Sequence, residues 1–302
     1  MKTLKLALDW TPNTNHIGFF VSKELGYYKE EGLQVELLNA EDDNYTVTPA
    51  KKVELGKADM ALCPFESIIS YRTKRQAFDA IGIATIFQED LSAIVVLEDS
   101  SIERPSDLDG KTYASYKARY EDEIVRQMII NDGGKGEMDL VYPDKLGIWE
   151  TLLSKKYDST WIFMNWEGVQ AHNQGVRLRA FRMSDYGIPY GYSPVLMVSK
   201  SKVDNSTEAY SSFLKATKKG FMYAKENPEQ AANILRPFVS ETDSDIDLVK
   251  SQKESLVAYG DTNEWGKMEK NRVNEFLQWL KETNLETSSL VYEDLVYQGL
   301  DY

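Results

Sequence analysis

Apolar positions in the first ninety residues follow two different spacings in turn. Short runs of alternating or β-branched apolar residues predict strands, and apolar residues three or four positions apart predict helices. Strands separated by helices of this length are typical of parallel β–α–β units. The predicted strands lie at 4–8, 34–38 and 58–62, and the predicted helices at 16–25 and 44–55.

The same alternation returns in the middle of the chain, so we expect a second lobe of the same kind. Two long apolar runs, 91–97 and 194–199, bracket this part, and a polar segment at 98–109 follows the first run. We place the crossing into the second lobe in that polar segment, and the second run returns the chain to the first lobe. The predicted strands are 112–115, 139–142 and 161–164, and the predicted helices are 120–131 and 145–154.

Helices alone are evident from Asn205 onward. Asn205 followed by Glu208 resembles a capping box, and Asn227-Pro228 is expected to end one helix and begin the next. We therefore expect an α/β fold with mixed, mostly parallel sheets flanked by helices: a discontinuous lobe of 1–98 and 199–302 and an inserted lobe of 99–198. The residues spaced as buried helix faces are Tyr210, Leu214, Thr217, Phe221 and Ala224, then Val273, Phe276, Leu277 and Leu280.

Composition narrows the classes of partner. The 302 residues include 48 acidic and 35 basic ones, for a net charge of −13, and an acidic surface argues against binding to nucleic acid. No apolar run approaches the roughly 18 residues that a membrane-spanning helix needs. With one cysteine and two histidines, a disulfide framework is excluded and a Cys/His zinc site is disfavoured. We expect no metal and no cofactor.

Familiar catalytic and nucleotide-binding motifs fail at named positions. Pro105 stands where a P-loop ending in Gly110-Lys111-Thr112 requires glycine, and 191–195 lacks the last glycine of G-x-S-x-G. Residues 1–9 alternate like a strand and lack the pattern of an export signal. Two interpretations of location stay open: cytoplasmic, or periplasmic or extracellular if a signal has been removed.

Polar and aromatic residues follow the first predicted strand directly. Asp9, Trp10, Asn15 and His16 could stack on a flat heterocycle and form hydrogen bonds with it, or Trp10 could plug the edge of the core. Glu66 opens the helix after the strand at 58–62, where it could bind a ligand or cap the helix. Ligands of such folds lie beyond the carboxyl ends of the strands, so we expect a cleft between the lobes.

The second lobe carries a corresponding set of candidate ligand-binding residues. Asn165, Trp166 and Glu167 follow the strand at 161–164, as a ligand-binding group or an ordinary acidic helix start. Tyr116 follows the strand at 112–115, and the two cations beside it suit an acidic ligand group or a solvated face. Tyr186 and Tyr190 precede the return strand, as lining of the cleft or as a surface turn. Trp10 with Tyr186 or Tyr190 would stack on the ring, Asp9, Asn15 and Glu167 would form hydrogen bonds, and hinge closure would bury the ligand.

Three segments resemble one known family. Residues 9–20 read DWTPNTNHIGFF, residues 23–33 read KELGYYKEEGL, and residues 56–61 read GKADMA. They resemble the thiamine-pyrimidine family, the NMT1/THI5-like and formylaminopyrimidine-binding proteins. The resemblance implies a two-lobed, type II periplasmic-binding-protein fold and one of two functions. One is a binding protein for a thiamine pyrimidine that serves an ABC transporter permease, and the other is a synthase that builds the pyrimidine from histidine and pyridoxal phosphate with iron.

The resemblance also separates these two branches. In the synthase branch a lysine, a histidine and a cysteine-rich stretch are required, and Cys63, Ser67 and the segment 191–193 stand at those positions here. An imine requires an amine, which neither a thiol nor a hydroxyl provides. We therefore expect a binder of a pyrimidine precursor in thiamine salvage or biosynthesis. The alternatives are the synthase and a binder of another small ligand, such as a sulfonate, because this fold hosts many ligands.

Overall fold

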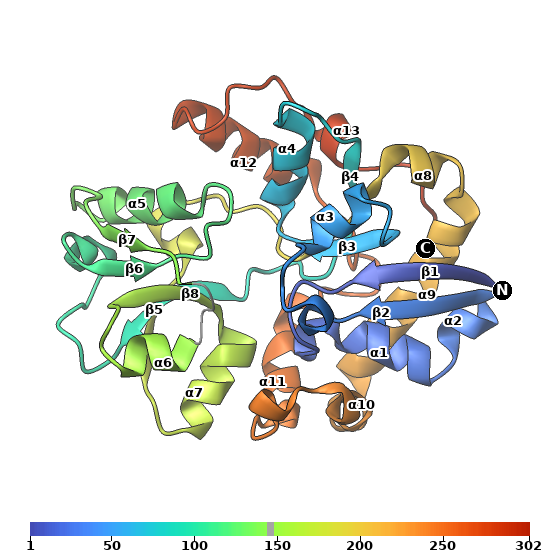
Figure 1. The fold of residues 1–302 in the computed structure, drawn as a ribbon, viewed down its shortest axis with the longest axis horizontal. Coiled ribbons are helices and arrows are strands. Elements are labelled where there is room, and N and C mark those ends of the chain that lie inside the picture. The colour runs from blue at the N-terminus through green and yellow to red at the C-terminus, as the bar shows by residue number, and fades with distance from the viewer. Residues whose placement is uncertain (144–147) are drawn as a thin grey trace. The chain divides into compact units, whose positions relative to one another are not determined.

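The computed structural model describes residues 1–143 and 148–302, which form two compact units. The first unit comprises 1–90, 191–274 and 288–302, and the second comprises 91–190 and 275–287. Each unit is built on one five-stranded sheet flanked by helices (Figure 1). Among the described residues, no helix is both long enough and apolar enough to cross a membrane.

The sheet of the first unit has the order β2-β1-β3-β10-β4. β1 pairs in parallel with β2 and β3, whereas β10 lies antiparallel between β3 and β4. Four strands therefore run in one direction, and the carboxyl ends of β1 and β3 meet at the same edge. The strands are β1 (Lys2–Ala7), β2 (Leu33–Leu38), β3 (Met60–Cys63), β4 (Ala80–Thr85) and β10 (Val195–Ser199).

The sheet of the second unit repeats this arrangement, with the order β7-β6-β8-β5-β9. β6 pairs in parallel with β7 and β8, and β5 lies antiparallel between β8 and β9. The expectation of mixed, mostly parallel sheets is confirmed in both units. The strands are β5 (Ser92–Leu97), β6 (Thr112–Ala114), β7 (Asp139–Val141), β8 (Ser159–Phe163) and β9 (Leu178–Phe181).

Close helix packing fixes the core of the first unit. α1 (Ile17–Glu24) lies against α9 (Thr207–Glu226), where a Cβ on Gly18 would come within 2.2 Å of the Phe221 ring. A Cβ on Gly220 would come within 2.2 Å of the Gly18 carbonyl oxygen, so both positions need glycine. The other helices of this unit are α2 (Tyr27–Glu30), α3 (Pro49–Glu54), α4 (Phe65–Thr73), α8 (Lys200–Asp204), α10 (Pro228–Leu235), α11 (Leu248–Ser255) and α13 (Tyr292–Leu295).

The second unit carries fewer helices along the chain. These are α5 (Glu121–Asn131), α6 (Ile148–Leu153) and α7 (Val169–Asn173). α12 (Lys270–Glu282) begins in the first unit and ends in the second. In the second unit its Phe276 contacts Tyr190, whose ring also packs edge-on against Trp161.

Most predicted elements are present, with two strands missed. β4 and β9 escaped prediction, because β4 contains Gly82 and is buried throughout, which removes any alternation, and β9 has only four residues. The predicted helix at 44–55 is too long: α3 begins at Pro49, and Asn44 and Tyr45 adopt left-handed φ angles of 52° and 59°. Of the helix predicted at 145–154, residues 148–153 are helical and 144–147 lie outside the described residues.

Two predictions about helix ends have different outcomes. The capping box of Asn205 and Glu208 is wrong, because Asn205 donates its side-chain amide to the Ser201 carbonyl oxygen at 2.8 Å, and α9 begins after Ser206. Asn227-Pro228 does separate α9 from α10, as predicted. The predicted helix faces at 210–224 and 273–280 are buried.

The strands next to the two crossings, β5 and β10, pair in other sheets than the predicted lobe boundaries imply. The lobe of 99–198 excludes β5, yet β5 pairs in the second sheet, and it includes most of β10, which pairs in the first. Within the first unit, Arg272 donates to the carbonyl oxygens of Gln88 and Gly191, and its guanidinium lies 4.1 Å from the Tyr192 ring centre. Arg272 thereby fastens together the chain segments at both crossings.

Candidate ligand-binding site

Asp9 and His16 form the centre of the polar edge at the end of β1. The His16 side chain is fully buried, and its Nε2 lies 2.7 Å from Asp9 Oδ1. Because the Asn13 backbone N–H donates to Nδ1 at 3.3 Å, the proton of a neutral His16 sits on Nε2 and is donated to Asp9. The Asp9 carboxylate is 24% exposed and accepts no other hydrogen bond from residues 1–143 and 148–302. One carboxylate oxygen is thus oriented by histidine and the other is available to a ligand.

A tight turn positions this pair. Asn13 Oδ1 accepts from the Asn15 backbone N–H at 2.8 Å, and Asn13 Nδ2 donates to the Thr11 carbonyl oxygen at 3.1 Å. Asn13 and Asn15 are each 3% exposed. The predicted contact residue Asn15 is therefore a buried part of the turn that holds His16 in place.

Trp10 forms an aromatic pair with Tyr45, a residue that the sequence did not single out. The ring centres are 5.3 Å apart and the planes are tilted by 51°. Both side chains are half-buried, and burial, with smaller effects from Glu41 and Asp243, raises the pKa of Tyr45 to about 12. Asn44 and Tyr45 both adopt left-handed φ angles, a backbone conformation that gathers at functional sites and that is visible only in the structure.

Cys63 and Glu66 complete the edge at the end of β3. Glu66 is 3% exposed in the first turn of α4, and Cys63 is buried. Burial raises the pKa of the Cys63 thiol, and the negative charges of Asp9 and Glu66 raise it further. The two carboxylates therefore lie close to Cys63 and to the boundary between β1 and β3, and the thiol is held in its unreactive, protonated form.

In the second unit, Glu121 organises the loop between β6 and α5. Its carboxylate accepts from the Tyr113 hydroxyl at 2.8 Å, from the Tyr116 N–H at 3.0 Å and from the Ala118 N–H at 2.9 Å. Glu121 is 3% exposed, and burial raises its pKa. This carboxylate is used to hold the loop in shape.

Tyr116 is the residue that this loop presents. Its side chain is exposed overall, but its hydroxyl is removed from solvent. This desolvation, together with the negative charges of Glu167 and Glu121, raises the pKa of the Tyr116 hydroxyl well above its usual value. Arg119, one of the two nearby cations, is paired with Glu286 at 2.6 Å, and Glu286 also accepts from the Tyr120 hydroxyl. The idea that this cation receives an acidic ligand group loses support, since its charge already has a partner.

Asn165, Trp166 and Glu167 lie in a π-helical turn, Met164–Gly168, directly after β8. π-turns are rare and often mark functional sites. Glu167 Oε2 accepts from the Phe163 N–H at 3.0 Å, and its charge reaches Tyr116. Asn165 and Trp166 are each 1% exposed, so Trp166 belongs to the core.

The two predicted tyrosines before β10 are placed differently. Tyr190 is buried between Trp161 and Phe276. Tyr186 accepts from Asn131 Nδ2 through its carbonyl oxygen, at the C-terminal end of α5. Tyr116 lies at the other end of that helix, about 15 Å away along an 11-residue helix. The charge of Glu167 therefore acts on Tyr116, whereas Tyr186 lies beside the C-terminal end of α5.

A family model described as NMT1/THI5 like matches residues 13–231, well over half of the chain. The chain belongs to this family. The family resemblance of the opening segments is thereby confirmed.

Relatives in this family include a binding protein and an enzyme. The formylaminopyrimidine-binding protein of Halalkalibacterium halodurans is 25% identical over 261 residues, covering 85% of this chain and 76% of that protein. The 4-amino-5-hydroxymethyl-2-methylpyrimidine phosphate synthase of Legionella pneumophila is 24% identical over 233 residues, covering 76% of this chain and 72% of the synthase.

Solved structures identify the fold. The alkanesulfonate-binding protein from Xanthomonas axonopodis pv. citri matches with a TM-score of 0.73 over 98% of both chains, at 9% identity. An identity this low shows the fold alone, which is the periplasmic-binding-protein fold that the family resemblance implied.

Proposed function

We propose that this member of the NMT1/THI5-like family binds an aminopyrimidine precursor of thiamine, of the formylaminopyrimidine or hydroxymethylpyrimidine type, without transforming it. The observation that carries this proposal is the Asp9 carboxylate, which is oriented by His16 and keeps one oxygen available, with Glu66 nearby. Amino groups on a heterocycle donate hydrogen bonds that carboxylates accept. The printed function of the Halalkalibacterium relative supports the same ligand class.

Roles follow from the chemistry and the contacts of each side chain. Trp10 with Tyr45 would supply an aromatic face for the ring, and Asp9 and Glu66 would accept from its N–H groups. Tyr116 and Glu167 are the corresponding candidate ligand-binding residues of the second unit. The remaining buried residues of the predicted set would support these groups: Asn15, His16, Asn165, Trp166 and Tyr190.

Pyridoxal phosphate, which the synthase branch implies, does not fit the residues at hand. Its attachment needs an amine, and the corresponding position holds the buried thiol of Cys63, with a raised pKa. Ser67, which stands where the synthase has histidine, contacts that thiol. The residues at these positions therefore favour binding over synthase chemistry.

A ligand panel tests the proposal. Binding stabilises the folded state, so formylaminopyrimidine or hydroxymethylpyrimidine should raise the melting temperature and give a saturable heat in calorimetry. Methanesulfonate serves as the competing ligand class. A shift with the sulfonate and none with either pyrimidine would overturn the thiamine assignment and favour a sulfonate binder. Conversion of the pyrimidine or turnover with pyridoxal phosphate, followed by mass spectrometry, would favour the synthase.

Hinge closure is a separate part of the proposal. If the two lobes close on the ligand, the radius of gyration in solution should fall when the pyrimidine is added, as measured by small-angle X-ray scattering. An unchanged radius with saturable binding would contradict closure and leave the binding function intact. An ABC transporter permease is the expected partner if the protein is exported.

A further inference from the structure

Negative charge gathers at the edge of the first sheet where β1 and β3 end, here called the carboxyl edge. Asp9 follows β1, and Glu66 lies in the first turn of α4, after β3. Burial and then the negative charges of these two residues raise the pKa of the Cys63 thiol, which ends β3. Both carboxylates thus act on one group, and neighbouring negative charge favours the protonated form of whatever binds there.

The tyrosine of the aromatic pair experiences the same sign of charge. After burial, which has the larger effect, the charges of Glu41 and Asp243 raise the pKa of Tyr45 to about 12. Asp243 lies 232 positions from Thr11 along the chain, yet its Oδ2 accepts from Thr11 Oγ1 at 3.2 Å and from Ser240 Oγ at 3.0 Å. These hydroxyls hold the Asp243 carboxylate beside the turn that follows β1, so its negative charge adds to that of the carboxyl edge.

His16 orients Asp9 without neutralising it. The His16 Nδ1 accepts from the Asn13 backbone N–H, so the ring carries its single proton on Nε2 and is neutral. That Nε2–H donates to Asp9 at 2.7 Å. α11 packs against the same turn through an uncharged contact, in which the hydroxyl oxygens of Thr14 and Ser251 are 2.7 Å apart. These neighbours fix the geometry of Asp9 and leave its charge in place.

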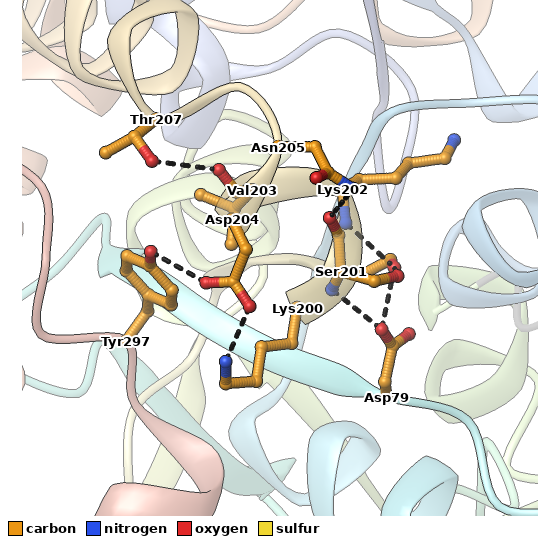
Figure 2. Close-up of polar contacts among 10 residues, drawn as sticks. Asp79, Lys200, Ser201, Lys202, Val203, Asp204, Asn205, Thr207 and Tyr297 are labelled. Atoms are coloured by element: carbon orange, nitrogen blue, oxygen red, sulfur yellow. Dashed lines mark hydrogen bonds and ion pairs between the residues drawn. The ribbon is translucent and has the colours of Figure 1, made fainter.

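Other carboxylates of the unit have lysine partners. Asp43 is paired with Lys52 at 3.1 Å. At the opposite edge of the sheet, where the antiparallel β10 ends, Figure 2 shows Asp204 of α8 accepting from Lys200 at 2.6 Å. The hydrogen bond from Lys200 lowers the pKa of Asp204. Asp9 has no lysine or arginine partner in the part of the chain that the structure describes, so its charge remains for a ligand to balance.

A neutral aminopyrimidine matches such a carboxylate only in part. Its exocyclic amino group donates hydrogen bonds, but the ring nitrogen beside that group has a lone pair, which an ionised carboxylate repels. Protonation turns the ring nitrogen into a donor and gives the paired N–H groups with which arginine binds carboxylates. The Asp9 oxygen that His16 leaves free can accept one of these groups, and the other oxygen keeps a lone pair for the second.

The aromatic pair favours the same charge on the ligand. Trp10 directly follows Asp9, and its ring centre is 5.3 Å from that of Tyr45. The face of an aromatic ring attracts a cation placed over it, and tryptophan does so most strongly. A carboxylate without a lysine partner and an aromatic face beside it therefore both select a positively charged ring.

We propose that the carboxyl edge binds the aminopyrimidine in its protonated, singly positive form, with Asp9 accepting from the ring N–H and the exocyclic N–H. This inference rests on the proposed binding of an aminopyrimidine and adds the charge state of the ligand. The ring nitrogen takes one proton from the solvent and forms one N–H bond, and no other bond of the ligand changes. Glu66 and Asp243 add negative charge that stabilises the bound cation.

Titration calorimetry in phosphate and in Tris at pH 7.5 counts the proton, because the two buffers release different heats when they give one up. Hydroxymethylpyrimidine should take up about one proton per bound ligand, and its affinity should fall about tenfold from pH 7 to pH 8. Equal heats in both buffers, with an affinity that does not change with pH, would overturn the proposal and leave aminopyrimidine binding intact. No binding at any pH would overturn the proposed function together with this inference.

Nitrogen NMR identifies the atom that carries the proton. Hydroxymethylpyrimidine labelled with ¹⁵N in the ring and bound at pH 7.5 should show the ring-nitrogen shift of the free ligand in acid. The shift of the neutral free ligand would contradict the proposal, because the proton would then have gone to the protein.

2-Aminobenzyl alcohol is the matched control ligand, since it keeps the amino and hydroxymethyl groups but has carbon in place of both ring nitrogens. It should bind about tenfold more weakly at pH 7, without proton uptake. Proton uptake as large as that of the pyrimidine would place the proton on the protein and refute the proposal.

A charge variant separates electrostatic selection from support of the fold. Asp243→Asn keeps an oxygen for the Thr11 and Ser240 hydroxyls but removes the charge, so the pyrimidine should bind about threefold more weakly and 2-aminobenzyl alcohol equally well. Asp245→Asn, at an exposed position two residues away, is the control and should leave both affinities unchanged. Equal losses of both ligands in Asp243→Asn would refute selection by charge.

Discussion

Each unit has a carboxylate between a parallel strand and the next helical segment, Asp9 in the loop after β1 and Glu121 at the start of α5, but the two carboxylates are used differently. Asp9, after β1, is 24% exposed and accepts one hydrogen bond, from His16. Glu121, after β6, is 3% exposed and accepts three. A carboxylate surrounded by donors from its own loop has no capacity left for a ligand, whereas one that keeps a free oxygen has. Equal topology therefore supplies comparable loops, and local hydrogen bonding decides the role of each carboxylate.

The largest expected effect on stability is at the second edge. Glu121→Leu leaves the buried Tyr113 hydroxyl and two partly buried backbone N–H groups without an acceptor, and should lower the free energy of unfolding by about 2 kcal/mol. Urea unfolding followed by tryptophan fluorescence measures this change. Glu123→Leu, at an exposed position of the same helix, should stay within about 0.5 kcal/mol. If both variants lose equally, Glu121 has no special role in the loop.

The next effect concerns ligand affinity at the first edge. Asp9→Asn removes a charged acceptor and turns one acceptor into a donor, so aminopyrimidine binding should weaken about 100-fold in calorimetry. The exposed carboxylate of Glu36, on the neighbouring strand β2, provides the control Glu36→Gln, which should bind normally. Retained affinity in Asp9→Asn with an unchanged melting temperature would remove Asp9 from the site.

Aromatic contact should matter less than the carboxylate. Trp10→Leu should weaken pyrimidine binding about tenfold, because it removes a ring face while leaving the polar groups in place. Tyr45→Leu, which removes the neighbouring ring, should cost about threefold. Fluorescence titration measures both dissociation constants. The reverse order of effects would make Tyr45 the main stacking residue.

The smallest expected effect is a pH-dependent change in the free energy of unfolding, and it arises at the C-terminal end of α5. Hydrogen bonds from Arg104 lower the pKa of Asp132 to about 2, below the ordinary 3.8. The folded state therefore holds this proton less tightly, so the pair stabilises the fold above pH 3.8, and that stabilisation is lost as the pH falls toward about 2. Asp132→Asn should cost about 1 kcal/mol at pH 6 and less at pH 3, as measured by urea unfolding. An equal loss at both pH values would refute this linkage.

Part of the candidate site could be predicted from sequence because the relevant signal is local. Asp9, Trp10 and His16 follow a clear strand, and the ends of parallel strands share one edge. Tyr45 was missed because its partner Trp10 is 35 positions away, and no local pattern in the sequence links the two residues. The sequence did not show that Trp166 and Tyr190 are buried, because burial depends on packing against residues far along the chain, such as Phe276 for Tyr190.

The sequence by itself determined the alternation of strands and helices, the family and the segments that carry polar groups at strand ends, because periodicity and short motifs are local. The tertiary structure decided the rest through long-range contacts. It inserted β10 between β3 and β4 and β5 between β8 and β9, and it brought Glu286 to Arg119. It also left Asp9 with a free oxygen while surrounding Glu121 with donors, since hydrogen bonding and burial arise only when separate segments meet.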